Sequence, residues 1–258
     1  MTRRRLIQAV NPLGWMVVLA IIALWQLLIE VGIINFDYTP PPTEIADGLG
    51  HLVASGEMGE AVVHTLTVTV VASAIAIAAG VTLGAALGLV KPVRTYSIGT
   101  VDFLRTVPVV ALMPVALLVW GASSKAEIIV ASYAAGWPVV VNTMAGVQSV
   151  HPLKRDVARS FRLSRSETLY KIVLPVATPA ILIGARLAIV SALVVAIVAE
   201  MLINPDGVGW GLVFSMQSLK PENMWAYAVV AGWMGYLMNA ILVYAVRRGG
   251  ANMGVAKA

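Results

Sequence analysis

The chain has no cysteine among its 258 residues and only three histidines. Without cysteine it can form no disulfide, no thiolate nucleophile and no thiolate metal site. The histidines, His51, His64 and His151, show no metal-ligand spacing, so the sequence predicts no metal site. It also lacks the Gly-x-x-x-x-Gly-Lys-Ser/Thr phosphate loop and any Ser-His or paired-carboxylate pattern within an apolar run. We therefore expect no catalytic residue and no directly bound cofactor.

Charge is scarce as well, at 12% of residues, whereas 59% are hydrophobic and the mean hydropathy is +0.85. A soluble domain of this composition would expose large apolar patches, so the sequence predicts an all-α polytopic membrane protein. A bilayer core requires about 20 apolar residues per helix. By this measure six transmembrane helices are expected, near residues 13–34, 60–90, 95–121, 125–148, 175–202 and 223–246. Pro108 and Pro114 predict a bend in the third.

The distribution of basic residues predicts the topology. Fourteen of the 18 Lys and Arg residues lie before the first span, after the second, after the fourth and after the sixth: Arg3, Arg4, Arg5, Lys91, Arg94, Lys154, Arg155, Arg159, Arg162, Arg165, Lys171, Arg247, Arg248 and Lys257. Cytosolic loops retain positive charge, so we expect one membrane domain, 1–258, with cytosolic tails at 1–12 and 247–258. This topology accounts for the net charge of +5 without a nucleic-acid partner. The first apolar run exceeds the length of a signal-peptide core, which favours an uncleaved anchor.

A long polar segment, 149–175, separates the fourth and fifth predicted spans. Its pattern predicts two short helices, at 156–163 and 165–173. Ser164 is a candidate N-cap for the second, with Glu167 three residues later in capping-box spacing. Pro175 suits the first turn of the fifth span, where a missing N–H costs nothing. A solvated basic loop is the simpler alternative.

The order of residues in this segment resembles the EAA loop of binding-protein-dependent ABC importer permeases. Asp156, Val157 and Ala158 occupy the Glu-Ala-Ala places, and Leu174 and Pro175 the Leu-Pro places. Arg162 stands where the family has Gly, which would permit a positive-φ turn between the two helices, a conformation that is costly for Arg. Further segments, including 38–44, 104–108, 112–114, 183–187, 199–201 and 207–211, resemble the nitrate, sulfonate and taurine branch.

This resemblance implies a type I permease subunit that passes a small anion, such as a sulfonate, nitrate, taurine or another organic anion, from an extracytoplasmic binding protein into the cytoplasm. The segment 149–175 would be a coupling loop that docks on separate ATPase subunits, which would hold the ATP. Its candidate coupling residues are Asp156, Val157, Ala158, Arg159, Arg162, Arg165, Leu174 and Pro175. A second permease copy, forming a homodimer in the bacterial inner membrane, is also implied. A secondary carrier or small channel is the alternative, but the two halves show no inverted repeat.

Ionisable residues within spans are costly and normally face protein or a wet cavity. Four are candidates for the translocation path: Asp102, Arg105, Arg186 and Glu200. The spacing of Asp102 and Arg105 predicts an ion pair on one helix face, which is also compatible with a purely structural role. In a different pattern, Gly80, Gly84 and Gly88 recur every fourth residue, which favours close helix packing over substrate contact.

Overall fold

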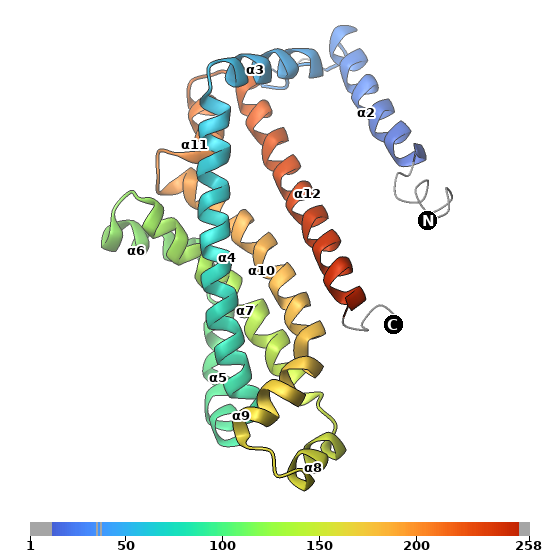
Figure 1. Ribbon diagram of the computed structural model, residues 1–258. Helices are drawn as coiled ribbons and strands as arrows, with labels where there is room; N and C mark the ends of the chain where they lie inside the picture. The colour runs from blue at the N-terminus through green and yellow to red at the C-terminus, as the bar shows by residue number, and fades with distance from the viewer. Residues whose placement is uncertain (1–11, 35, 37, 253–258) are drawn as a thin grey trace. The chain divides into compact units, whose positions relative to one another are not determined.

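The computed structural model describes residues 12–34, 36 and 38–252, and within them it contains helices and no strand. The predicted all-α class is therefore confirmed. The helices are α2 Pro12–Glu30, α3 Pro42–Ala54, α4 Glu57–Leu89, α5 Lys91–Thr106, α6 Val109–Trp120, α7 Ser124–Gln148, α8 Pro152–Ser160, α9 Arg165–Thr168, α10 Leu174–Leu202, α11 Gly207–Gln217 and α12 Pro221–Asn252 (Figure 1). One π-helical turn, Leu169–Val173, joins α9 to α10.

Four helices are long and apolar enough to cross a membrane: Glu57–Leu89, Ser124–Gln148, Ser166–Leu202 and Pro221–Tyr244. They match the second, fourth, fifth and sixth predicted spans. The predicted first span, 13–34, forms a shorter apolar helix that ends at Glu30, because Gly32 adopts a φ of 74° and turns the chain. The charge-based orientation of the termini stays a prediction.

The third predicted span is broken into α5 and α6, whose axes differ by 85°. Val107 is extended, as the residue before a proline prefers, and Pro108 supplies no N–H to continue α5. Pro114 lies inside α6 without ending it. The predicted bend is thus confirmed, but it is concentrated at Pro108.

The described residues fall into two compact units. The first comprises residues up to Gly59 together with Gly211–Val229. In it, the Trp25 and Trp225 rings meet edge to face at 5.3 Å, and the Trp225 Nε1 donates a hydrogen bond of 2.9 Å to the Tyr38 carbonyl oxygen. These contacts fix the chain around the proline-rich segment that precedes α3.

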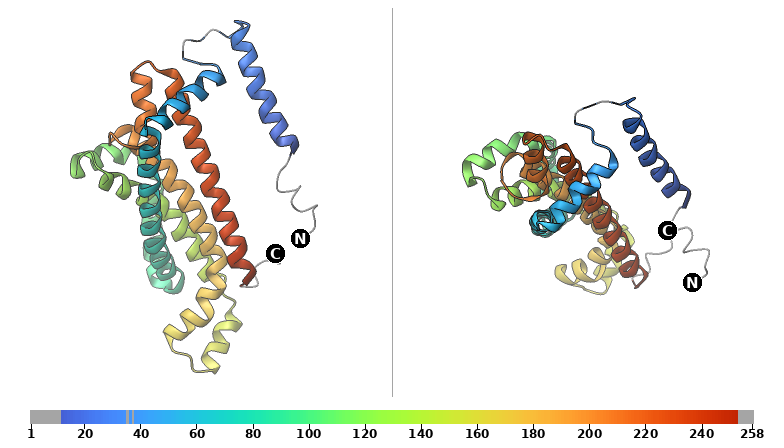
Figure 2. Two further views of the ribbon diagram at one scale, coloured as in Figure 1. Left: turned by 45° about the horizontal axis from the view of Figure 1, so that its top comes forward. Right: turned by 90° about the horizontal axis from the view of Figure 1, so that it is seen from above.

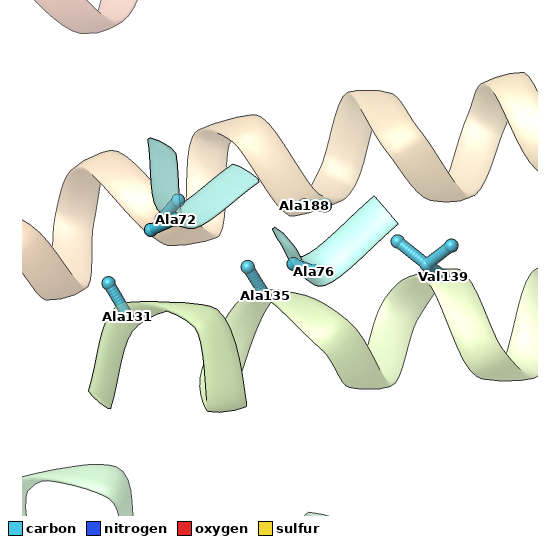
Figure 3. Close-up of a cluster of buried hydrophobic side chains, with 7 residues drawn as sticks. Ala72, Ala76, Ala131, Ala135, Val139 and Ala188 are labelled. Atoms are coloured by element: carbon cyan, nitrogen blue, oxygen red, sulfur yellow. The ribbon is translucent and has the colours of Figure 1, made fainter. Parts of the chain in front are cut away.

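The second unit comprises Glu60–Trp210 and residues from Val230 onward. Its core is a bundle in which α4, α7 and α10 lie side by side (Figure 2). The buried residues where the three helices meet are mostly alanines: Ala72, Ala76, Ala131, Ala135, Val139, Ala188 and Ala192 (Figure 3). Small side chains let helix backbones approach closely, which is the main source of helix association in lipid.

The three glycines of the repeat on α4 face α7. A Cβ placed on Gly80 would lie 2.5 Å from Val139 Cβ, and one on Gly88 would lie 2.7 Å from Val147 Cβ. On Gly84 it would lie 2.6 Å from the Val140 carbonyl oxygen. All three distances are shorter than van der Waals contact, so the approach of α4 to α7 depends on these residues lacking a side chain.

Candidate functional site

A groove of about 730 Å³ lies in the second unit between the α5–α6 break, α7 and α10. Its polar residues are Arg105, Thr106, Asn142 and Ser191. The rest of its wall is Val109, Ala134, Trp137, Pro138, Val141, Leu187, Val190, Val194 and Val195. At 1.5 Å per residue, Ser191 is roughly 25 Å from the start of α10, which places the groove near mid-height of this span. A mostly apolar hollow with few polar groups is typical of a small-molecule site.

Arg105 brings a positive charge to this groove. Its Nε donates a hydrogen bond of 2.9 Å to Asp102 Oδ1, so the ion pair expected from their spacing forms, and both side chains are about half exposed. The Tyr133 hydroxyl donates to the Leu104 carbonyl oxygen at 2.6 Å, which holds the end of α5 against α7. Within the described part of the chain, no hydrogen bond is formed by the two Nη groups of Arg105. They can therefore donate to a ligand.

The other two predicted path residues lie elsewhere. Arg186 donates from Nε and Nη2 to Asn239 Oδ1, at 3.1 and 2.8 Å, and so connects α10 to α12. Glu200 is fully buried near the end of α10, where its Oε2 accepts the N–H of Gly209 at 2.9 Å. Neither residue lines the groove, and their part in a translocation path stays a prediction.

In the loop 149–175, the first helix begins and ends earlier than predicted. It spans Pro152–Ser160 rather than 156–163. His151 caps its start, with Nδ1 accepting the Leu153 N–H at 3.2 Å. At its end the N–H of Arg162 donates to the Arg159 carbonyl oxygen, and that of Leu163 donates to the Ala158 carbonyl oxygen. This is the hydrogen-bond pattern of a Schellman motif, with Arg162 at a φ of 53° where Gly is favoured.

We expect Arg162→Gly to stabilise this loop by up to about 1 kcal/mol, because the left-handed conformation costs a non-glycine residue roughly that much. Hydrogen exchange of the α8 amides should slow in the variant. Arg162→Val, which is β-branched and tolerates positive φ even less well, should accelerate it. Equal exchange in all three proteins would contradict the expected strain.

The second helix begins with the predicted capping box. The N–H of Ser164 donates to Glu167 Oε2 at 3.0 Å, and the N–H of Glu167 donates to Ser164 Oγ at 3.2 Å. Lys171 Nζ also donates to Glu167 Oε1 at 2.8 Å. The Lys171 ammonium, followed by the hydrogen bonds from Ser164, lowers the pKa of Glu167 to about 2. The helix then continues through the π-helical turn into α10, with Pro175 in the first turn of α10 as predicted.

This lowered pKa predicts how loop stability depends on pH. Between about pH 4.5 and pH 2 the unfolded chain binds more protons at Glu167 than the folded chain does, so the contribution of Glu167 is complete above this window and is lost as the pH falls through it. Glu167→Ala should therefore speed exchange of the α9 amides at neutral pH and have a much smaller effect near pH 2. The pair is exposed, so added salt should reduce the difference. A difference independent of pH would contradict the role of the carboxylate.

The loop also exposes an apolar face. Leu153, Val157 and Phe161 recur every fourth residue, which places them on one side of α8, and they are 66%, 46% and 76% exposed. We call these three residues the α8 apolar face. Leu153 and Val157 also line a smaller hollow of about 290 Å³ with Lys154, Lys171, Ile172, Pro175 and Val176. Ala158, on the other side, is buried. Exposed apolar side chains of this kind mark a surface that contacts either another protein or the membrane.

Sequence reasoning did not single out Asn142 and Ser191. Each is a polar residue in an apolar span, and that is the signal that could have identified them. Glu127 was not singled out either, and it lies fully buried in the first turn of α7. Its Oε2 is 3.0 Å from His64 Nε2, a contact between residues far apart in sequence that no local pattern reveals.

Comparison with known proteins identifies the family of this chain. Residues 76–248 match the family model described as the binding-protein-dependent transport system inner membrane component. SsuC of Bacillus subtilis, named for aliphatic sulfonates transport, is 28% identical over 89% of this chain and 84% of its own. The bicarbonate transport permease CmpB of Synechococcus elongatus is 30% identical over 70% of this chain and 66% of its own. The taurine transport permease TauC of Escherichia coli is 25% identical, over 90% and 85%.

The fold has solved counterparts. A chain of the MetNI methionine ABC transporter in an inward-facing conformation matches with a TM-score of 0.65 at 16% identity, over 76% of this chain and 97% of its own. A chain of an amino acid ABC transporter matches with a TM-score of 0.63 at 17% identity, over 78% and 97%. The family match excludes the secondary-carrier alternative. The chain belongs to the family of binding-protein-dependent transport system inner membrane components, and it is a permease subunit of an ABC importer rather than an enzyme.

Proposed function

We propose that this permease passes a small anion along the groove beside Arg105. The observation that carries this proposal is the placement of a guanidinium with free donors in a mostly apolar hollow near mid-height of the spans. A guanidinium fork suits planar or tetrahedral oxyanions. The relatives named for sulfonate, taurine and bicarbonate transport support the same class of substrate.

Asp102 explains how such a site could pass an anion without retaining it. Its carboxylate offsets the charge of Arg105 at a distance of 2.9 Å and repels an anion at the same time. Selection would then take place mainly at a separate extracytoplasmic binding protein. The groove would then bind the anion strongly enough to let it enter and weakly enough to release it.

The energy would come from ATP hydrolysed on separate ATPase subunits that dock on the loop 149–175. The α8 apolar face is the surface we assign to this contact, flanked by the basic residues Lys154 and Arg159. Asp156, Val157 and Ala158 at the Glu-Ala-Ala places lie on α8, and Leu174 and Pro175 begin α10. ATP binding would bring the two ATPases together and switch the spans between inward-facing and outward-facing states. A second permease copy would complete the path, with both termini cytosolic.

The test is uptake of radiolabelled anions by cells that produce the complete system, using taurine, an alkanesulfonate, nitrate and bicarbonate as probes. For the anion that is transported, Arg105→Gln should lower the uptake rate about tenfold, because a charge-assisted hydrogen bond contributes about 1.5–3 kcal/mol. Arg105→Lys should retain part of the rate, since it keeps the charge but not the fork.

Arg186→Gln is the matched control, because it removes a guanidinium from a span without changing the groove lining. Membrane levels of all variants should be compared by immunoblot. Normal uptake by a normally expressed Arg105→Gln protein would remove the proposed anion contact.

A further inference from the structure

Three ionisable side chains from three helices meet in the second unit, away from the groove. They are His64 of α4, Glu127 of α7 and Glu200 of α10, and each offers a ligand atom within 4.8 Å of those of the other two. Glu127 lies in the first turn of α7, and the coupling loop follows the other end of this helix. At 1.5 Å per residue, the cluster is therefore roughly 33 Å from the coupling loop along α7. The proposed transport step does not use it.

Both carboxylates are fully buried and incompletely paired. Glu127 and Glu200 have side-chain exposures of 0%, and the Oε1 atom of each is buried without a hydrogen-bond partner. Burying a carboxylate without a compensating charge costs several kcal/mol, and two adjacent carboxylates also repel each other. Within the described residues, His64 is the only basic side chain that forms an ion pair with either one. A single imidazolium can balance one carboxylate, so two ionised carboxylates at this place require a further positive charge.

We propose that His64, Glu127 and Glu200 bind a divalent first-row metal ion of the zinc class. One imidazole nitrogen and two carboxylate oxygens form a ligand set suited to Zn²⁺ and to the neighbouring ions Co²⁺ and Mn²⁺, and two positive charges balance the two carboxylates. The ion would supply the two incompletely paired carboxylates with a cationic partner. The ion would join α4, α7 and α10 outside the groove lining, so we assign it a structural role.

The distance between two of the ligand atoms suits such an ion, and the Glu200 carboxylate, within 4.8 Å of both, would move inward to complete the site. His64 Nε2 and Glu127 Oε2 are 3.0 Å apart, near the roughly 3.3 Å that separates two ligand atoms on one tetrahedral zinc ion. Asn204 Nδ2 lies 3.4 Å from the same imidazole nitrogen, so a neutral amide borders the cluster. His64 retains 20% side-chain exposure, which provides an entry route for an ion.

The test uses the full-length protein, carrying a tag without histidines and extracted in mild detergent with its attached subunits. After chelator treatment and dialysis, Co²⁺ is added and visible d–d absorption is recorded, followed by displacement with Zn²⁺. Wild-type protein should bind one ion per permease chain, show ligand-field bands that Zn²⁺ abolishes, and unfold at a higher temperature with the metal. Glu127→Gln and His64→Gln should weaken binding at least tenfold, whereas Glu127→Asp, which keeps a carboxylate, should weaken it less.

His51→Gln is the matched control, since it removes an exposed histidine of α3, and it should bind Co²⁺ as the wild type does. The wild-type spectrum decides the matter even where a variant does not fold. Absence of the bands in folded wild-type protein would overturn the proposal and leave the cluster as a proton-sharing hydrogen-bond network. Binding that is unchanged in folded Glu127→Gln and His64→Gln proteins would overturn it equally, because the metal would then lie elsewhere. Neither result affects the anion groove.

Discussion

Val157→Asp should separate the permease from its ATPase and bring ATP-driven uptake down to background. Val157 is the central residue of the α8 apolar face and is 46% exposed, so the free permease can accommodate the carboxylate in water. When an ATPase covers this face, the carboxylate loses its hydration and gains no partner, which costs about 3–5 kcal/mol. Since each 1.4 kcal/mol corresponds to a factor of ten in affinity, association should weaken at least about 100-fold.

The measurement is the amount of ATPase that co-purifies with tagged permease, together with ATP hydrolysis in the purified sample. Ser166→Asp is the matched control, because it adds the same charge to the same loop in the first turn of α9, where a negative charge is favourable. It should retain both the ATPase and uptake. Val157→Ala should have an intermediate effect. An ATPase that co-purifies in wild-type amount with Val157→Asp would show that α8 docks through another face or not at all.

The features that could be predicted from the sequence are those set by local chemistry. The length of the apolar runs located four spans, because the thickness of a bilayer sets the length of a transmembrane helix. Ser164 and Glu167 predicted a capping box, which requires only two residues three positions apart. The bend at Pro108 follows equally from a missing N–H. Each of these depends on neighbours in the sequence and needs no knowledge of the tertiary structure.

The remaining features depend on contacts across the sequence or on a conformation that the residue type disfavours. The end of α8 was predicted three residues too late because an arginine gives no signal of a left-handed turn. The backbone nevertheless takes the left-handed conformation at Arg162. The groove takes its polar groups from α5, α7 and α10, so no single segment reveals it. Similarly, the contact of His64 with Glu127 joins residues 63 apart. At the end of α8, the family pattern, which has Gly where this chain has Arg162, carries information that local propensity does not.

Gly84→Leu should prevent the second unit from folding, or reduce its stability by more than about 3 kcal/mol. Even a Cβ at this position would lie 2.6 Å from the Val140 carbonyl oxygen and 2.7 Å from Thr143 Cβ. Backbone atoms of a long helix cannot move aside individually, so α4 and α7 would have to separate along their length and open the alanine contacts with α10. In lipid no hydrophobic force compensates for lost helix packing, because the acyl chains are equally apolar.

Gly99 provides the matched control, because it also lies within a helix, α5, but a Cβ there would meet nothing within 4 Å. Gly84→Ala should lower the midpoint of thermal unfolding, followed by tryptophan fluorescence in detergent, whereas Gly99→Ala should leave it unchanged or raise it slightly through better helix propensity. The unfolding midpoint of Gly84→Leu should also be lower than that of Gly99→Leu, and this difference should be larger than the difference between the two alanine variants. Equal midpoints for the two alanine variants would mean that α4 and α7 do not approach as closely as these distances require, and the alanine-lined core would then contribute less to the stability of the permease than its burial indicates.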